Sequence, residues 1–343
     1  MAAIADAGGA PRESLGRSID RLFDEERVGK TDALLIVKRG TLIVERYGDG
    51  IEADTRLPGW SAGQCITALM IGQLVSDGRL RSPNRRLFRN GSVLAIRAAS
   101  SPCGSCCRCA PACATSRQRQ SARAGYPAIG SHAHAVPRRQ GRHGLVCGGA
   151  AAGGAGREGV RAFVRERGHS LRPCRARTFV RPQSGSPPTR GGEYLRHRVL
   201  APIGMNSTLV AYDRAGTMIG SGMIAATARD WSKLGEFLRH SGSVKGAQIL
   251  PRRWVQFMLE PSPREPAYGA GVWLNRGEAG DGARLWPATA PRSVFACLGE
   301  YGQYVIGSPD QLLTVVRIGH SNPEQEREVR DELGALLALF PKN

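Results

Sequence analysis

The sequence predicts an α+β fold in which an antiparallel sheet is built from both ends of the chain and flanked by helices. Two observations support this prediction. Segments with the composition of strands occur near both termini, and segments with helical periodicity lie beside them. A third observation limits it, because residues 81–192 follow neither periodicity. We therefore expect the helical part of the fold to be disrupted there.

The first 80 residues have the pattern of ordinary globular sequence. The stretch SIDRLFDEERVG has a helical stripe of apolar residues. Ala33–Val37 and Thr41–Arg46 predict two short strands joined by a tight turn at Arg39-Gly40. The stretch from Ser61 to Ser76 predicts a helix that is apolar on nearly every side and therefore buried.

The globular pattern returns from about residue 193. GGEYLRHRVLAPIGM is helix-like and ends at Pro202-Ile203-Gly204, and IAATARDWSKLGEFLRHSG is an amphipathic helix with Thr227 as N-cap and Gly242 as its stop. Three strands are expected next, in YGAGVWLN, in SVFACLGEYGQYVIGS with a bend near its glycines, and in QLLTVVRIG. NPEQEREVRDELGALLALF predicts a closing helix with an apolar face.

Charge and cysteine are concentrated in the middle segment. The 343-residue chain carries a net charge of +19 and nine cysteines. Residues 81–192 hold 21 arginines, no lysine, two glutamates and no aspartate, so this segment alone accounts for the whole net charge. Seven of the nine cysteines also lie there. The remainder is charge-balanced and long enough to bury a sizeable core.

The composition of residues 81–192 could indicate zinc or nucleic-acid binding, and neither interpretation is favoured. Cys103 and Cys106 have the spacing of zinc ligands, but no second pair follows, and the adjacent Cys106 and Cys107 suit no common site. We expect no metal and no cofactor. The arginines lack interleaved aromatic residues for base stacking, so specific nucleic-acid recognition is not expected. Non-specific association with nucleic acid remains a weaker alternative.

The genetic code offers a different explanation of the same segment. Every cysteine codon is TGT or TGC, so a shifted codon spanning Cys106-Cys107 reads leucine whichever codons are used. In that frame RAASSPCGSCCRCAPAC is compatible with R-V-I-T-V-R-Q-L-L-P-M-R-T-G-L, which contains a helix-like pattern. We interpret residues from about 81 to 190 as frameshifted; the alternative is a disordered, arginine-rich insertion.

No segment predicts attachment to a membrane. The sequence has no apolar run of 18 residues or more, and its N-terminus lacks a basic start followed by an apolar stretch. A cytoplasmic location is therefore expected, which an upstream start would change. The sequence predicts neither a membrane partner nor an oligomeric state.

Several separated blocks resemble one family. LPGWSAGQCITALM places Ser61 at the start of a buried helix, and TDALLIVKRGTLIVERYG, GSGMIAATARDWSKLGEFLRHSG, YGAGVWLN and GEYGQYVIGSPDQLLTVVRIG occur in family order. The chain resembles the serine β-lactamase-related hydrolases: class C β-lactamases, penicillin-binding proteins, esterases and, most of all, 6-aminohexanoate-dimer hydrolases. The resemblance covers residues 15–80 and 193–340. It implies a β-lactamase/transpeptidase-like fold in which residues 1–80 and 193–343 together form the α/β part.

The resemblance also implies site residues. In the family a Ser-x-x-Lys motif supplies the nucleophile and a neighbouring lysine, and a tyrosine shares the proton transfer. Ser61 matches the serine and Gln64 occupies the lysine position, on the same helix face. No tyrosine candidate is found, and it is expected near residues 179–188. A substrate-binding and oxyanion strand motif, usually Gly-His-x-Gly-Gln, is matched by Gly299, Glu300, Gly302 and Gln303, with Glu300 where histidine is common.

The expected function is therefore a serine hydrolase acting on a small ester or amide, such as a β-lactam, a short-chain ester or a linear amide, through an acyl-serine. A serine hydroxyl needs a group that accepts its proton, and glutamine cannot serve. Loss of a general base costs about 10²–10⁴-fold, so activity is expected to be impaired. The alternative is an inactive pseudoenzyme or the product of a decayed gene. The family often has Lys-Ser where this chain has Gln64-Cys65, so both residues could be later changes.

Overall fold

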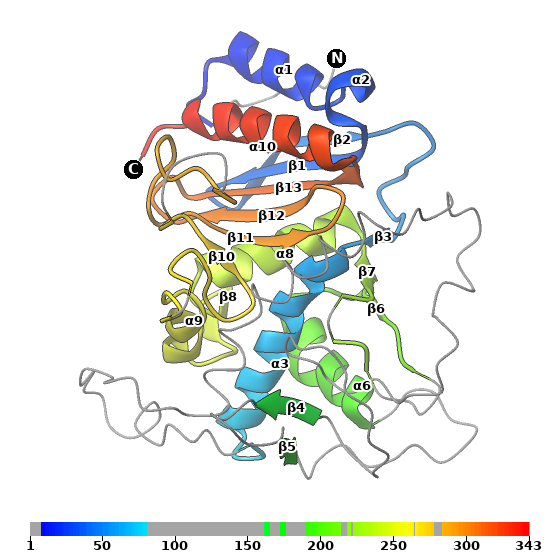
Figure 1. The fold of residues 1–343 in the computed structure, drawn as a ribbon, viewed down its shortest axis with the longest axis vertical. Coiled ribbons are helices and arrows are strands. Elements are labelled where there is room, and N and C mark those ends of the chain that lie inside the picture. The colour runs from blue at the N-terminus through cyan, green and yellow to red at the C-terminus, as the bar shows by residue number, and fades with distance from the viewer. Residues whose placement is uncertain are drawn as a thin grey trace.

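The structure is a computed structural model, and it describes residues 8–80, 161–164, 172–175, 190–213, 218–220, 222–263, 265–277 and 283–342. Most of the 81–192 segment lies outside these residues, and with it the predictions of a frameshift, of a zinc-type cysteine cluster and of a tyrosine near 179–188. Figure 1 shows the described elements as a central sheet with helices on both faces.

A six-stranded antiparallel sheet joins the two ends of the chain, as the sequence predicts. Its strand order is β10-β11-β12-β13-β1-β2. The strands are β10 (Trp273–Leu274), β11 (Phe295–Gly299), β12 (Gln303–Ser308), β13 (Leu313–His320), β1 (Lys30–Lys38) and β2 (Thr41–Tyr47). Because β1 pairs with β13, the N-terminal hairpin extends a sheet made otherwise from the last part of the chain.

The side chains of the buried strand β1 pack into two separate hydrophobic cores. Successive side chains of a strand point to opposite faces. Leu34 and Ile36 therefore pack into the core beneath the terminal helices, and Ala33 and Leu35 pack into the core on the other face. All four are fully buried, and burying a leucine or isoleucine side chain contributes about 1.5–3 kcal/mol. The run of five apolar residues at positions 33–37 follows from burial on both faces.

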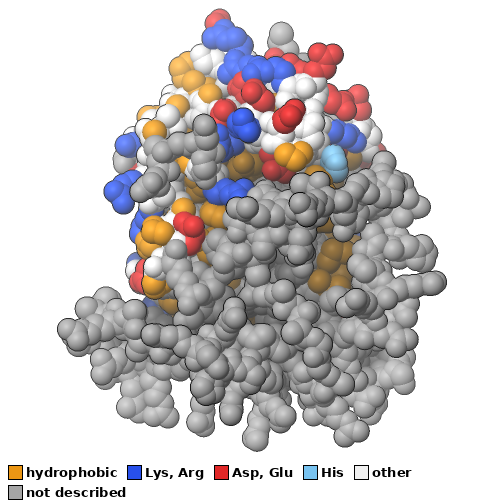
Figure 2. Space-filling view, in the orientation of Figure 1, with side chains coloured by type: hydrophobic (Ala, Val, Ile, Leu, Met, Phe, Trp, Pro, Cys, Tyr) orange, Lys and Arg blue, Asp and Glu red, His pale blue; other side chains and the backbone are white. Residues whose placement is uncertain are grey.

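Three helices cover one face of the sheet: α1 (Arg12–Arg21), α2 (Glu25–Val28) and α10 (Pro323–Ala338). The α10 helix starts at a capping box. The side chain of Asn322 accepts a hydrogen bond from the backbone N–H of Gln325, and the side chain of Gln325 accepts one from the backbone N–H of Asn322. Figure 2 shows acidic and basic side chains interspersed on this end of the molecule, where Arg21 and Glu332 form an ion pair at 2.7 Å.

The opposite face of the sheet carries α8 (Ala228–Arg239) and, beneath it, α3 (Gln64–Ser76). Thr227 caps α8 as predicted, its side chain accepting from the N–H of Asp230. All residues of α3 from Cys65 to Val75 are buried, which confirms the predicted buried helix. Its first turn differs from the prediction, since Trp60–Gly63 forms a 3-10 helix, η1.

The other elements are short. A small sheet is formed by β3 (Leu57–Pro58), β7 (Ile224–Ala226) and β6 (Leu209–Val210), and two hairpins pair β8 (Ser243–Val244) with β9 (Ala247–Gln248) and β4 (Arg161–Val164) with β5 (Arg172–Arg175). A helical stretch consists of α6 (Arg190–Leu195), the π-helical η3 (Arg196–Leu200) and α7 (Ala201–Ile203), and α9 spans Arg252–Met258. The helical stretch from α6 to α7 ends at Gly204, which adopts the left-handed conformation typical of a helix C-terminus.

One strand prediction was wrong. SVFACLGEYGQYVIGS is not a single bent strand but a hairpin of β11 and β12, whose tip is Glu300, Tyr301 and Gly302. Tyr301 and Gly302 have φ values of 65° and 79°, which reverse the chain where a bend was expected. Among the described residues, no helix is both long and apolar enough to cross a bilayer.

Candidate active site

Ser61 lies at the junction of a strained turn and the buried helix α3. The residue before it, Trp60, has a φ of 48°, a conformation that costs a non-glycine residue free energy and requires support from its surroundings. Ser61 is half-buried and precedes α3 by the short η1 turn. It therefore lies at the positive end of the helix, where developing negative charge is favoured.

The hairpin tip between β11 and β12 brings a carboxylate to this serine. The hydroxyl of Ser61 donates to Oε1 of Glu300 at 3.0 Å. The backbone N–H of Ser61 donates to Oε2 of the same side chain at 3.2 Å. Glu300 is solvent-exposed, so the hydroxyl and the N–H of the candidate nucleophile are both hydrogen-bonded to a side chain on the solvent side of the site.

Two glycines make this approach possible. A Cβ on Gly299 would lie 2.2 Å from the carbonyl oxygen of Gly59, so only glycine lets the end of β11 pack directly against the turn that carries Ser61. A Cβ on Gly302 would lie 2.7 Å from Nη1 of Arg317, and Gly302 also has a positive φ. Both glycines of the predicted strand motif therefore shape the site through the backbone.

Tyr301, at the hairpin tip, stacks between two aromatic neighbours. Its ring packs edge-to-face on Trp60 with centroids 5.1 Å apart and stacks on His320 at 4.5 Å. Such contacts offset the cost of a tyrosine at positive φ. The same stack connects the turn before Ser61 to the turn that carries Glu300.

Behind the tip, Gln303 and Arg317 hold its backbone. Gln303 was predicted to lie on the substrate-binding strand, and it is fully buried, with its amide donating to the carbonyl oxygens of Glu300 (2.9 Å) and Gly319 (2.6 Å). Arg317 is also fully buried and donates to the carbonyl oxygens of Tyr301 (3.3 Å) and Gly302 (2.9 Å). These bonds give Gln303 a positioning role behind Glu300.

The N–H groups of the tip face a second carboxylate. Burial raises the pKa of Glu326 above its ordinary value, and hydrogen bonds from the backbone N–H groups of Tyr301 and Gly302 oppose that rise. With the N–H of Ser61 bonded to Glu300, these three backbone donors all have carboxylate acceptors. An oxyanion that accepts from the N–H of Ser61 must therefore displace Oε2 of Glu300.

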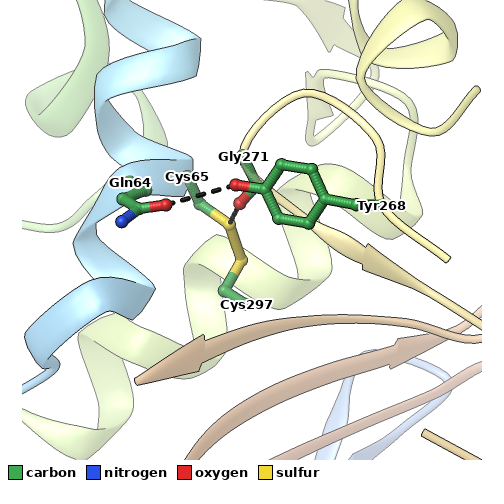
Figure 3. Close-up of a disulfide and its surroundings, with 5 residues drawn as sticks. All are labelled: Gln64, Cys65, Tyr268, Gly271 and Cys297. Carbon is green, nitrogen blue, oxygen red and sulfur yellow. Dashed lines mark hydrogen bonds between the residues drawn. A yellow bond between two sulfur atoms is a disulfide. The ribbon is translucent and has the colours of Figure 1, made fainter. Parts of the chain in front are cut away.

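Gln64, at the expected lysine position, has a tyrosine beside it. The hydroxyl of Tyr268 donates to Oε1 of Gln64 at 3.2 Å (Figure 3). Tyr268 is 2% exposed and packs edge-to-face on Trp273 at 5.0 Å. Sequence reasoning missed this residue, although the quoted block YGAGVWLN contains it, because only the folded chain shows that the block reaches α3.

A disulfide joins the two halves of the site. Cys65, next to Gln64, is bonded to Cys297 on β11, across a sequence separation of 232 residues (Figure 3). Both cysteines are buried, and the Cys65 sulfur lies 2.8 Å from the carbonyl oxygen of Gly271. The cross-link ties the start of α3 to β11.

The structure thus brings Ser61 and Glu300 into contact and pairs Gln64 with Tyr268. Gly299, Gly302 and Gln303 support the hairpin tip. Within the described ranges, no cluster of three or more histidine, cysteine or acidic side chains could hold a metal ion. The chemistry available at this point is that of a hydroxyl, a carboxylate and a helix terminus.

No family model matches this sequence, and no curated protein sequence matches it. Solved structures share its fold. EstCE1, described as a hydrolase with promiscuous acyltransferase activity, is 14% identical, with a TM-score of 0.53 over 95% of this chain and 99% of its own. A Bacillus anthracis protein assigned as a 6-aminohexanoate-dimer hydrolase is 16% identical, with a TM-score of 0.52 over 94% and 83%.

A family VIII carboxylesterase is 13% identical to this chain, with a TM-score of 0.50 over 93% of it and 97% of the esterase. At such low identities the structural similarity shows the fold alone. The chain has the α+β, β-lactamase/transpeptidase-like fold that its sequence blocks predict.

Proposed function

We propose that this protein is a serine hydrolase that cleaves small esters, and amides more slowly, through an acyl-serine on Ser61. The observation that carries this proposal is the position of Ser61, with its hydroxyl at the start of a buried helix and facing the tip of the β11–β12 hairpin. The names given to the proteins of similar fold, a hydrolase and a carboxylesterase, support the same class of reaction.

The polar groups favour esters with good leaving groups. Gln64 can neither accept a proton from Ser61 nor donate one as an acid to a leaving amine. An ester with a stable leaving group needs no such protonation, whereas an amide does. Activity is therefore expected to be low on linear amides and measurable on activated esters.

Labelling and turnover together test the proposal. A fluorophosphonate probe should label the purified protein at Ser61, and hydrolysis of p-nitrophenyl acetate should be lost in Ser61→Ala. Ser76→Ala, at the exposed end of the same helix, is the matched control and should keep both activities. Equal turnover by wild type and Ser61→Ala would refute the proposal.

A non-catalytic protein is the second candidate. It is favoured by the pairing of Ser61 with Glu300 and of Gln64 with Tyr268, which leaves neither the hydroxyl nor the amide oxygen without a partner. Such a pseudoenzyme would bind an acyl-amide ligand without forming a covalent adduct. Absence of probe labelling, together with ligand-induced stabilisation that Ser61→Ala retains, would favour it.

A further inference from the structure

We propose that Glu300 is a catalytic residue, the base that accepts the proton of Ser61 in place of a lysine at position 64. The inference rests on the proposed function and names the group that makes Ser61 reactive. It follows from the contact itself: Oε1 of Glu300 lies 3.0 Å from the Ser61 hydroxyl that donates to it. A base must lie within about 2.6–3.2 Å of the heavy atom whose proton it removes.

The carboxylate is held in this position by the fold. Gln303 and Arg317 bond the carbonyl oxygens of the hairpin tip, and Tyr301 stacks on Trp60 directly before Ser61. The disulfide from Cys65 to Cys297 fixes β11 to α3 two residues before Gly299. Ser61 and Glu300 are therefore carried by one rigid unit, as a proton-transfer pair requires.

The second oxygen of Glu300 explains how a substrate would enter. In the structure Oε2 accepts from the N–H of Ser61, the donor best placed to stabilise an oxyanion on the attacked carbonyl. A bound ester must replace Oε2 at this N–H with its own carbonyl oxygen. Because the two oxygens belong to one carboxylate, a rotation about the Oε1 contact releases the N–H and keeps the proton acceptor in place.

The proton and electron pairs then balance through one cycle. Oγ of Ser61 attacks the ester carbonyl carbon as its proton moves to Glu300, and the carbonyl π pair moves to oxygen. Collapse of the adduct breaks the bond to the leaving alkoxide, which takes the proton from Glu300 and departs as an alcohol. Water then attacks the acyl-serine while giving a proton to Glu300, and that proton returns to Ser61 as the acid leaves.

Three variants separate a base from a merely structural carboxylate. Glu300→Gln keeps the shape and removes the charge, Glu300→Ala opens space for an added carboxylate, and Glu13→Gln is the control. Glu13 is 90% exposed on α1, away from the site. The measured quantities are the rate of fluorophosphonate labelling at Ser61, p-nitrophenyl acetate turnover, and the melting temperature of each variant.

Glu300→Gln should lower both rates by about 10²–10⁴-fold, the usual cost of losing a general base, with an unchanged melting temperature. Added formate should restore labelling of Glu300→Ala by at least about tenfold and have no effect on Ser61→Ala. A structural role would not respond to formate. Should Glu300→Gln fail to fold, the formate arm decides alone.

Equal or faster labelling of Glu300→Gln would overturn the inference and identify Glu300 as a block on the Ser61 N–H, while the proposed function would stand. Failure of formate to act on folded Glu300→Ala would also overturn it. Wild-type protein that is not labelled at Ser61 would refute the proposed function, and this inference with it.

Discussion

The hydroxyl of Tyr268 donates a hydrogen bond to the side-chain oxygen of Gln64, 3.2 Å away, at the position where the resemblance led us to expect lysine. The tyrosine comes from a segment far along the chain and is buried against Trp273. The fold therefore places a phenol beside position 64, within reach of a base introduced there.

Gln64→Lys is expected to raise the rate of Ser61 labelling and ester turnover by about 10²–10⁴-fold, because it supplies a second proton acceptor one helical turn after the nucleophile. Probe labelling under single-turnover conditions measures the change. Gln64→Met, which packs without a proton acceptor, is the control and should show no gain. A folded Gln64→Lys protein with the wild-type rate would contradict this expectation.

Reduction of the Cys65–Cys297 disulfide should destabilise the protein. For a loop this long the chain-entropy treatment gives a stabilisation of about 5–6 kcal/mol, and strain or residual structure reduces this value. Urea unfolding with and without dithiothreitol measures the difference. The control is Cys65→Ser/Cys297→Ser, which keeps the seven other cysteines of the chain. Equal sensitivity of that double variant to dithiothreitol would place the effect elsewhere.

Arg317→Met should cost about 3–5 kcal/mol of unfolding free energy, because removal of a buried guanidinium leaves its acceptors unpaired. Burial lowers the pKa of Arg317 to about 10, so the side chain is charged at neutral pH. Besides the hairpin tip, its acceptors include the carbonyl oxygen of Lys30 at 3.1 Å. Arg27→Met, on an exposed side chain, is the control and should leave the free energy of unfolding close to the wild-type value.

The Glu45–Arg229 pair predicts a small acid-dependent stability. Hydrogen bonds from Arg229 at 2.6 and 2.7 Å lower the pKa of Glu45, and partial burial opposes them. A carboxyl group whose pKa is lower in the folded than in the unfolded protein stabilises the fold at pH values above its unfolded-state pKa. That stability is lost as the pH falls through the folded-state pKa. Because Arg229 is 55% exposed, the contribution is under about 1 kcal/mol.

Glu45→Gln should therefore be less stable than wild type at pH 7, and the two unfolding curves should converge as pH falls below the ordinary glutamate pKa. Melting temperatures across that range measure the difference. Glu13→Gln, which removes a 3.6 Å pair between highly exposed side chains, should show no such convergence. A gap between wild type and Glu45→Gln that persists in acid would assign the loss to packing.

The sequence predicted correctly those elements that depend on neighbouring residues, such as helix caps, tight turns and the apolar face of a helix. Thr227 caps α8, and Arg39-Gly40, with φ values of 52° and 80°, forms the predicted turn between β1 and β2. Helix α10 buries the apolar face that its 3.6-residue period predicts, which consists of Val329, Leu333, Leu336 and Leu337.

The site was harder to predict because its contacts are long-range. Tyr301 has a positive φ, although it is neither glycine nor asparagine, the residues that usually mark a hairpin turn. It is held by a hydrogen bond from Arg317 and by stacking on His320. The resemblance placed Glu300 opposite Ser61, but nothing in the sequence showed that its carboxylate bonds the hydroxyl. The disulfide was missed because most cysteines lie elsewhere and its partners are 232 residues apart.

The strand order of the main sheet also determines when the protein can fold during synthesis. Strand β1 leaves the ribosome early, yet its partner β13 lies at residues 313–320. Until then β1 has only β2 to pair with, and one backbone edge of a strand with five consecutive apolar residues stays open to other chains. Ribosome stalling before residue 313 should therefore favour aggregation of the nascent chain.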